Sequence, residues 1–270
     1  RADQLSLQAT LPQLWATVGE HRSRTEAARA ARGTPSSGPV FAGLVGGLGQ
    51  LPVVLAEGLE VETEALVRGL SRTETGWRLE LTGRHMSVDG VVLAVPAAPA
   101  ARLLEGLVPV EELAGVGYAS VAIVTLVLDG PTPGRGTGYL VPAVEGLTTK
   151  AVTFSSRKWA RPGPAVVRAS VGRFGEERDL QRDDADLVAL VLRELERVVG
   201  PLPRLIDSSV MRWGGGLPQY AVGHLDLVRR LRAALPAGLA VAGAAYDGVG
   251  VPAVVRSGQQ AARDVLAGVG

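Results

Sequence analysis

The C-terminal part of the chain constrains the fold more than any other segment. An apolar run at 239–242 is followed by Gly243, Gly248 and Gly250, and then by Pro252. The run predicts a buried strand, the glycines predict a turn with unusual backbone angles, and proline favours the first turn of a helix. The N-terminus of such a helix favours a phosphate or a flat, electron-poor ring.

The alternative to a ligand site here is a tight strand-to-helix connection that binds nothing. A helix N-terminus stabilises an exposed anion by about 0.3–1 kcal/mol and a partly buried one by up to ~2 kcal/mol, too little to hold a ligand alone. The sequence contains neither Gly-x-Gly-x-x-Gly nor Gly-x-x-x-x-Gly-Lys-[Ser/Thr], the patterns that hold nucleotide phosphates. We therefore expect half of a larger nucleotide-type socket.

Composition excludes several classes of function. The 270 residues are 46% hydrophobic with a formal net charge of +1, so we expect a sizeable core and no nucleic-acid partner. The absence of cysteine excludes disulfides and thiolate chemistry and fits a reducing compartment. No signal-peptide pattern stands at the start, and we expect a cytoplasmic location. A charged, helix-prone stretch at 17–32 leaves a peripheral membrane contact open.

The rest of the sequence alternates apolar strands with helices, which indicates an α/β fold. The stretch 33–39 is rich in glycine, proline and serine and is typical of a linker. Strands are expected at 64–70, 77–81, 91–95, 116–128, 139–142, 152–154, 166–171 and 206–213. Helices are expected at 17–32, 46–58, 97–104, 183–199, 224–235 and from 252 onward.

Three of these segments allow predictions about packing. Residues 91–95 are uninterrupted and apolar, as in a strand buried on both faces. The glycine-rich segment 213–220 is expected to be irregular. The inner face of the helix at 183–199 is predicted from helical spacing to consist of Leu187, Val191, Leu195 and Val198.

Three side chains near the C-terminus could take part in chemistry. Trp213 could pack against a planar cofactor or could be ordinary core. His224 stands near a helix start, where capping or surface exposure competes with a catalytic role. Asp247 could act as a general base, although an aspartate beside glycines is usual in turns. No serine–histidine–aspartate grouping or paired carboxylates stand out, so we predict no catalytic side chain and no metal site.

Taken together, these segments resemble one known family. Residues 213–224 fit the pattern W-x-x-x-x-P-Q-Y-x-x-G-H, and residues 239–252 with 257–262 fit a C-terminal flavin motif. Weaker matches extend the likeness over nearly the whole chain, at 5–14, Phe41 with 46–48, and 92–96. The family is the oxygen-dependent protoporphyrinogen/coproporphyrinogen III oxidases, which are FAD flavoproteins of haem biosynthesis.

The resemblance implies an amine-oxidase-like architecture, in which an FAD-binding nucleotide-fold domain is interleaved with an α+β mixed-sheet substrate domain. In the family, the FAD pyrophosphate is held by a Gly-x-Gly-x-x-Gly loop near the N-terminus, and this sequence lacks it. We therefore expect a C-terminal portion whose N-terminal half is missing. Its expected parts are 1–40 (helical region and linker), 41–98 (FAD domain), 99–208 (substrate domain) and 209–270 (FAD domain).

The resemblance also implies site residues, matched position by position. Those expected to contact FAD are Val67, Trp213, Ala244, Val249, Gly250 and Val251. Those expected to line the tetrapyrrole pocket are Gly138 and Leu140, within a segment that matches the family's Gly-x-Gly-x-Leu-Val-Pro.

The implied reaction is oxidation of coproporphyrinogen III to coproporphyrin III by the parent protein with FAD and O₂, releasing H₂O₂. The 270 residues alone are expected to be inactive. Lysine is almost absent while arginine, alanine, glycine and valine abound, which is typical of a high-GC bacterium. Within the family that the chain resembles, high-GC Gram-positive bacteria typically carry the coproporphyrinogen III enzyme, so the resemblance favours this substrate, and protoporphyrinogen IX stays an alternative. Another FAD enzyme of the amine-oxidase fold is a further alternative, weakened because neither Lys150 nor Lys158 lies in a flavin motif. A non-catalytic scaffold or binding protein that keeps the fold is the last. The oligomeric state is left open.

Overall fold

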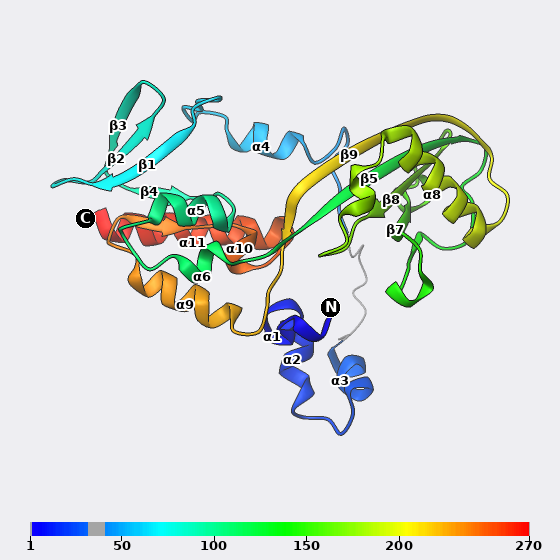
Figure 1. The fold of residues 1–270 in the computed structure, drawn as a ribbon, viewed down its shortest axis with the longest axis horizontal. Helices are drawn as coiled ribbons and strands as arrows, with labels where there is room; N and C mark the ends of the chain where they lie inside the picture. The colour runs from blue at the N-terminus through cyan, green and yellow to red at the C-terminus, as the bar shows by residue number, and fades with distance from the viewer. Residues whose placement is uncertain (1, 32–40, 270) are drawn as a thin grey trace. The chain divides into compact units, whose positions relative to one another are not determined.

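The computed structural model describes residues 2–31 and 41–269 (Figure 1). The linker expected at 33–39 lies outside these residues. Figure 1 follows the order of the helices and strands along the chain.

By its internal contacts the chain forms two compact units, and each is described by itself. Unit 1 is Gly117–Gln219, and unit 2 combines Ala2–Val116 with Tyr220–Gly270. The domain limits expected from the sequence, after residues 40, 98 and 208, stay predictions.

Unit 1 is built on a five-stranded antiparallel sheet with strand order β6-β7-β8-β5-β9. Its strands are rich in valine, threonine and other β-branched residues, which pack well on a pleated surface. The strands are β5 (Tyr118–Asp129), β6 (Gly138–Leu140), β7 (Thr149–Phe154), β8 (Ala165–Val171) and β9 (Arg204–Pro218). The helices are α7 (Ser155–Lys158) and α8 (Asp184–Val199), with 3-10 turns η2 (Ala143–Glu145) and η3 (Arg178–Gln181).

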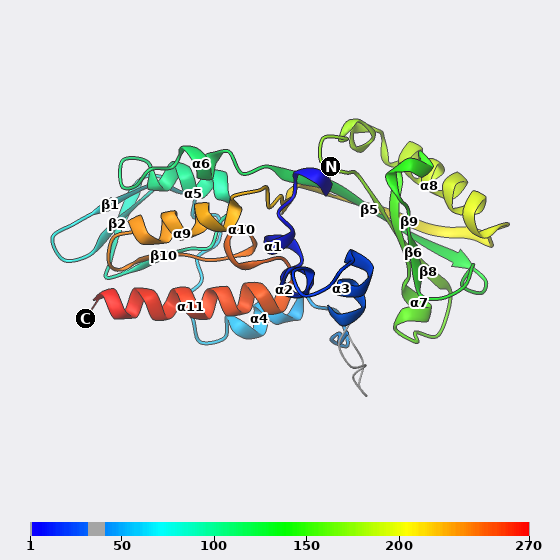
Figure 2. The same cartoon turned by 90° about the horizontal axis from the view of Figure 1, so that it is seen from below.

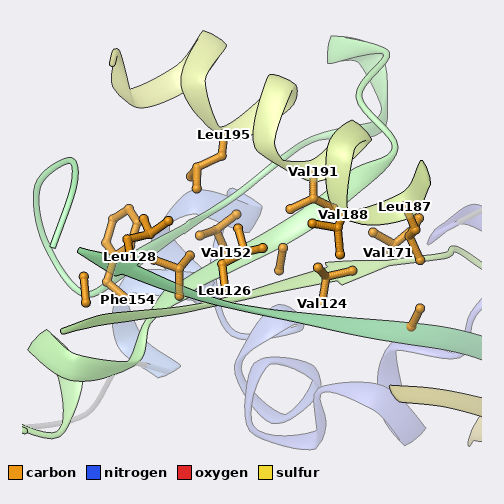
Figure 3. Close-up of a cluster of buried hydrophobic side chains, with 14 of the residues drawn as sticks. Val124, Leu126, Leu128, Val152, Phe154, Val171, Leu187, Val188, Val191 and Leu195 are labelled. Carbon is orange, nitrogen blue, oxygen red and sulfur yellow. The ribbon is translucent and has the colours of Figure 1, made fainter. Parts of the chain in front are cut away.

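Helix α8 covers one face of this sheet, and the core of unit 1 lies between them (Figure 3). Leu187, Val191 and Leu195 are buried, as predicted. The prediction for Val198 was wrong, because that side chain is 46% exposed. Val199 packs against the core instead, since a step of four residues from Leu195 keeps the apolar stripe facing the sheet.

Strand β9 is longer than its sequence predicts. It runs through the glycine-rich segment, so the expectation of irregular structure from Trp213 onward was wrong as far as Pro218. Pairing with β5 continues past the glycines through a register shift between Ala119 and Val121. Gly215, with φ of 58°, absorbs part of the bend. Tertiary pairing has overridden the weak strand propensity of glycine.

Unit 2 contains a three-stranded antiparallel sheet, β1-β2-β3, and a separate parallel pair, β4 and β10. The strands are β1 (Val67–Arg72), β2 (Trp77–Leu81), β3 (Arg84–Val88), β4 (Val91–Leu93) and β10 (Leu239–Val241). The helices before β10 are η1 (Ala2–Gln4), α1 (Leu7–Thr10), α2 (Pro12–Val18), α3 (Arg24–Ala31), α4 (Gln50–Leu55), α5 (Ala97–Leu104), α6 (Glu111–Ala114) and α9 (His224–Ala234). Two helices follow β10, α10 (Ala244–Asp247) and α11 (Val251–Val269).

The C-terminal strand, turn and helix form as predicted. All three residues of β10 are buried, and α11 packs against β10 and β4 (Figure 2). The short helix α10 inside the turn was not predicted. Helix α11 begins at Val251, one residue before the proline that was expected to open it.

Two other predictions for unit 2 need correction. Residues 91–95 were expected to be buried on both faces, but Val92 is exposed and the strand ends at Leu93. The reason is that β4 pairs with β10 alone and has one covered face. The single helix expected at 17–32 is instead two, α2 and α3, separated by a turn. Within the described residues, no helix is both long and apolar enough to cross a bilayer.

Candidate functional site

The turn after β10 has the backbone shape that its glycines predict. Gly243, Gly248 and Gly250 have φ angles of 119°, 109° and 103°, which only glycine adopts readily. A Cβ built on Gly243 or Gly250 would meet no heavy atom within 4 Å beyond its chain neighbours. The turn therefore requires glycine for its angles and leaves room for a ligand to approach its backbone.

The corner between α10 and α11 is open. Val249 is 52% exposed and Val251 is 42% exposed. The N–H groups of Ala253 and Val254 donate to the Gly250 carbonyl at 3.0 and 3.1 Å, closing the first turn of α11. The side chains of Val249 and Val251 are thus accessible at this corner and are not packed into the core of the unit.

Two side chains from the Pro-Gln-Tyr…Gly-His segment hold α10 in place. The Tyr220 hydroxyl donates a hydrogen bond to the Ala244 carbonyl. His224 Nε2 lies 2.9 Å from the Ala245 carbonyl oxygen. The two rings stack on each other with centroids 4.6 Å apart. The motif thus fixes two successive peptide groups, those of Ala244 and Ala245, in the turn at 243–250.

His224 is buried, with 6% of its surface exposed, so the expectation of helix capping or surface exposure was wrong. Because a carbonyl only accepts, Nε2 must carry the proton in this contact. Burial lowers the pKa of His224 below its ordinary value, and the hydrogen bond to Ala245 opposes that shift in part. The imidazole is therefore neutral near pH 7 and serves as a donor to backbone.

Asp247 and Ser257 tie the turn to α11. The Gly243 N–H donates to Ser257 Oγ at 2.8 Å, and the Ser257 hydroxyl donates to the Asp247 carboxylate. Arg232 Nη2 donates to the same carboxylate at 2.6 Å. Burial raises the pKa of Asp247, but the hydrogen bonds from Arg232 and Ser257 and the charge of Arg232 outweigh it, so the pKa is lowered. Two donors, Arg232 and Ser257, hold this carboxylate ionised and tie it to the turn, which favours turn chemistry over a general-base role.

The structure brings together some of the predicted FAD residues. Ala244 opens α10, and Val249, Gly250 and Val251 form the corner, so these four lie on one continuous turn. Val67 lies elsewhere in unit 2, at the start of β1, where the register shifts between Val67 and Gly69.

Gly138 and Leu140, the predicted substrate residues, lie in strand β6 of unit 1. A Cβ on Gly138 would stand 2.2 Å from the Val152 carbonyl oxygen, so only glycine fits beside β7. Leu140 is 82% exposed. Gly138 therefore has a packing reason to be glycine, whereas Leu140 presents an apolar side chain that no described residue covers.

The loop before β6 is held by one arginine. Arg157 of α7 donates hydrogen bonds to the carbonyls of Thr132, Gly134 and Gly136 at 2.7, 3.1 and 2.8 Å. Its guanidinium also lies over the Phe154 ring, 5.5 Å from the centroid. No local sequence pattern predicts this contact, because α7 and the loop meet only through the tertiary fold.

The register of the five-stranded sheet sorts its residues into two faces. Tyr139, Val152 and Val124 belong to the face under α8. Their neighbours along each strand alternate to the opposite face. Two cross-strand rows can be followed over that opposite face, Leu140–Ala151–Ser170–Ile123–Met211 and Gly138–Thr153–Arg168–Thr125–Ser209. Both substrate residues predicted from the sequence therefore lie on the face that α8 does not cover.

Trp213, the predicted flavin residue of unit 1, is paired with Val121 and lies two residues from Met211 on β9. By alternation it shares the face of Met211, and its side chain is largely exposed. Trp213 is therefore a surface residue of unit 1, which counts against the reading of it as ordinary core.

Three residues that shape the turn at 243–250, namely Tyr220, Ser257 and Arg232, were not predicted from the sequence. The motif containing Tyr220 was recognised, but its role in holding a carbonyl was not. Ser257 could have been suspected from its small polar side chain on an apolar helix face. Among the described residues there is no group of three or more acidic or histidine side chains that could hold a metal.

The sequence matches the family of flavin containing amine oxidoreductases over residues 1–266. The chain belongs to this family. Membership of the family confirms the expected flavin cofactor and the amine-oxidase-like fold.

Curated relatives carry narrower names. Coproporphyrinogen III oxidase of Mycobacterium tuberculosis (strain ATCC 25618 / H37Rv) is 40% identical over 97% of this chain and 59% of its own length. Coproporphyrinogen III oxidase of Bacillus subtilis (strain 168) is 30% identical over 98% of this chain and 60% of its own. Protoporphyrinogen oxidase of Homo sapiens is 31% identical over 83% of this chain and 51% of its own length. The chain thus spans somewhat more than half the length of the relatives it matches.

Solved structures show the same fold. A protein from Exiguobacterium sp. 255-15 described as a protoporphyrinogen oxidase superposes with a TM-score of 0.83 at 31% identity, over 96% of this chain and 59% of its own. Cyclohexylamine oxidase from Brevibacterium oxydans IH-35A superposes with a TM-score of 0.66 at 17% identity, over 81% of this chain and 52% of its own. The second likeness concerns the fold alone.

Proposed function

We propose that the whole protein oxidises coproporphyrinogen III to coproporphyrin III with FAD and O₂, releasing H₂O₂. Bound FAD would supply the redox chemistry, accepting hydride from the macrocycle and passing the electron pair to O₂. The proposal is supported by the relative from Mycobacterium tuberculosis, which is 40% identical and is named coproporphyrinogen III oxidase. The residues of this chain would position the two reactants and exclude water.

The observation that carries the proposal is the turn at Gly243 and Gly250. Positive φ angles and open space at both Cβ positions leave peptide groups accessible to a flat ring. The N-terminus of α11 faces the same corner and stabilises negative charge on a reduced flavin. Tyr220, His224 and Ser257 hold the turn in this shape before any ligand arrives.

Within this proposal, Ala244, Val249, Gly250 and Val251 contact the flavin through backbone groups. Val67 is assigned to the adenine end of FAD, where its strand setting suits a backbone contact. Trp213 is assigned to the flavin ring, since an exposed indole offers a flat surface for packing.

Gly138 and Leu140 are assigned to the tetrapyrrole. The row that starts at Leu140 and ends at Met211 is largely apolar, with the small side chains of Ala151 and Ser170 next to Leu140 and the larger Ile123 next to Met211. The pyrrole rings of the macrocycle would lie across such a row while its polar edges reach the flanking residues. No side chain is assigned as an acid or base.

The test uses the whole protein purified with FAD. We expect a yellow protein that converts coproporphyrinogen III to a fluorescent porphyrin in air, with H₂O₂ accumulating in proportion. Porphyrin should stop forming when O₂ is removed. A protein that neither takes up FAD nor gives fluorescence would sink the proposal and favour a scaffold or binding role.

Protoporphyrinogen IX oxidation is the second candidate, because the human relative and the Exiguobacterium structure bear that name. Parallel assays with both porphyrinogens separate the two. A larger kcat/KM for coproporphyrinogen III supports the first candidate, and a larger value for protoporphyrinogen IX supports the second.

A further inference from the structure

Arg168 stands in the middle of the sheet face that α8 leaves uncovered. It lies on β8, the central strand in the order β6-β7-β8-β5-β9. Thr153 on β7 and Thr125 on β5 are its direct cross-strand partners. Paired residues of this kind have Cβ atoms about 4.5–5.5 Å apart. The arginine is therefore flanked by a hydroxyl on each side.

The guanidinium of Arg168 is exposed and forms no hydrogen bond or ion pair with any residue in the described part of the chain. Two exposed arginines near the ends of the sheet and of η3 are paired with acidic side chains, Arg204 with Asp129 and Arg182 with Asp179. Two strand positions of this face, among the described residues, bear acidic side chains. Asp129 lies at the far end of β5 and pairs with Arg204, and Asp207 lies two strands from Arg168 and in a different row. Two strand spacings alone amount to about 10 Å.

The surroundings of Arg168 are otherwise apolar or small. The next row of the same face carries Leu140, Ser170 and Ile123. The guanidinium beside an apolar row matches a ligand that has a large apolar body and a carboxylate on a short arm. A porphyrinogen, whose pyrrole rings carry propionate side chains, has that chemistry.

We propose that Arg168 binds a propionate carboxylate of the substrate, with the hydroxyls of Thr125 and Thr153 available as further donors. This inference rests on the proposed function, since it takes a porphyrinogen as the ligand of this face. It assigns Arg168 to binding and orientation of the macrocycle, with no part in redox chemistry.

The test compares Arg168→Gln with the unchanged whole protein. The product coproporphyrin III is the probe for binding, followed by its own fluorescence, and coproporphyrinogen III is the substrate for kinetics. Loss of a charged hydrogen-bonding partner should raise Kd and KM by about 10- to 100-fold. The kcat at saturating substrate should stay within about threefold, since the interaction is made equally in ground and transition states.

Arg193→Gln is the matched control. Arg193 is an exposed arginine of the same unit, but it lies on α8, away from this face. The control should bind coproporphyrin III as the unchanged protein does. Arg168→Lys keeps the charge without the forked geometry and should fall between the two.

The outcomes distinguish the two proposals. If the unchanged protein oxidises coproporphyrinogen III but Arg168→Gln leaves Kd and KM unaltered, the assignment of Arg168 is wrong and the proposed function stands. If the unchanged protein oxidises neither porphyrinogen, the proposed function fails. If Arg168→Gln does not fold, Arg168→Lys is compared with the unchanged protein by the ratio of its Kd values for coproporphyrin III methyl ester and for coproporphyrin III. This ratio should be smaller in Arg168→Lys, and an equal ratio in the two proteins overturns the assignment.

Discussion

Tyr220 and His224 bind carbonyl oxygens of the turn at 243–250, and Ser257 accepts an N–H of the same turn. These side chains can affect ligand binding without contacting the ligand, because they hold the backbone of the turn in place. Buried polar groups that lose a partner cost about 1–3 kcal/mol. Substitutions at these positions should therefore loosen the turn before they affect chemistry.

Stability should depend on pH through His224. Its pKa is lowered in the folded state, so the unfolded chain binds the proton more readily. This contribution to stability is present above the unfolded pKa of about 6.5 and is lost as pH falls through the folded pKa. We expect the free energy of unfolding to drop below pH 6.5, as measured by denaturant titration at several pH values.

The matched variants for this experiment are His224→Gln and His85→Gln. Glutamine at 224 can still donate to the Ala245 carbonyl but does not titrate, so the drop below pH 6.5 should become smaller. His85 is exposed on β3, and its replacement should leave the pH profile as it was. Equal profiles for all three proteins would show that His224 is not buried as described.

Gly250→Ala tests the backbone of the corner. Alanine at a φ of 103° is strained, and a positive φ costs a side chain roughly 1–2 kcal/mol. The added methyl group also enters the open space where the flavin is proposed to lie. We expect the Kd for FAD in the whole protein to rise about tenfold or more, measured by quenching of flavin fluorescence.

Gly19→Ala is the control, because Gly19 has an ordinary φ of −79° and open space around it. It should leave FAD binding unchanged. An unaltered Kd in Gly250→Ala, in a folded protein, would remove this corner from the flavin site.

At the scale of elements, the sheet of unit 1 depends on contacts that bridge distant parts of the sequence. Glu194 of α8 accepts the N–H groups of Thr148 and Thr149, both at 2.8 Å, and so fixes the start of β7. Burial, with a smaller effect from the charge of Glu194, raises the pKa of Tyr139 on the adjacent strand to about 12. Tyr139 therefore stays protonated at any physiological pH.

Arg157→Gln should open the loop before β6. Without the guanidinium, the loop carbonyls between 132 and 136 lose their donor, and Arg135 in the same loop becomes a better substrate for trypsin. A loss of 1–2 kcal/mol in local stability corresponds to about 5- to 30-fold more of the open form. We expect cleavage after Arg135 to accelerate by that factor, followed by mass spectrometry.

Arg161→Gln serves as control for the loop experiment, because its exposed side chain has no hydrogen bond to the loop among the described residues. It should be cleaved after Arg135 at the original rate. Equal rates in both variants would mean that Arg157 does not order the loop.

The type of most elements could be predicted from periodicity, because strands and helices repeat at two and 3.6 residues. The limits of β9 could not, since its glycines are held by pairing with β5. The turn at 243–250 was predicted because glycine and proline act locally. The buried state of His224 was not, because its partner Ala245 lies 21 residues away. Contacts at long sequence separation leave no periodic signal.

At the scale of the whole molecule, the matched length sets the expectation for cofactor binding. The chain covers 59% of the mycobacterial relative and contains no Gly-x-Gly-x-x-Gly. The pyrophosphate of a dinucleotide is usually held by such a loop. The turn described here offers the ring a surface but no such cradle for phosphate.

We therefore expect the 270 residues on their own to bind FAD weakly. Titration with FAD should show no saturation at micromolar concentration, whereas the whole protein should saturate. Riboflavin, which lacks the pyrophosphate, should bind the 270 residues about as well as FAD does. Micromolar binding of FAD would show that the phosphate contacts are supplied by residues within this chain.

The cross-strand rows of unit 1 have a practical consequence for anyone who wishes to alter ligand preference. Consecutive positions in a strand alternate between the two faces, so mutagenesis of a contiguous stretch would damage the core at every second residue. A library drawn across the strands, at Leu140, Ala151, Ser170, Ile123 and Met211, would vary one surface and spare the interior. Positions for redesign are therefore best chosen across neighbouring strands, not along a single strand.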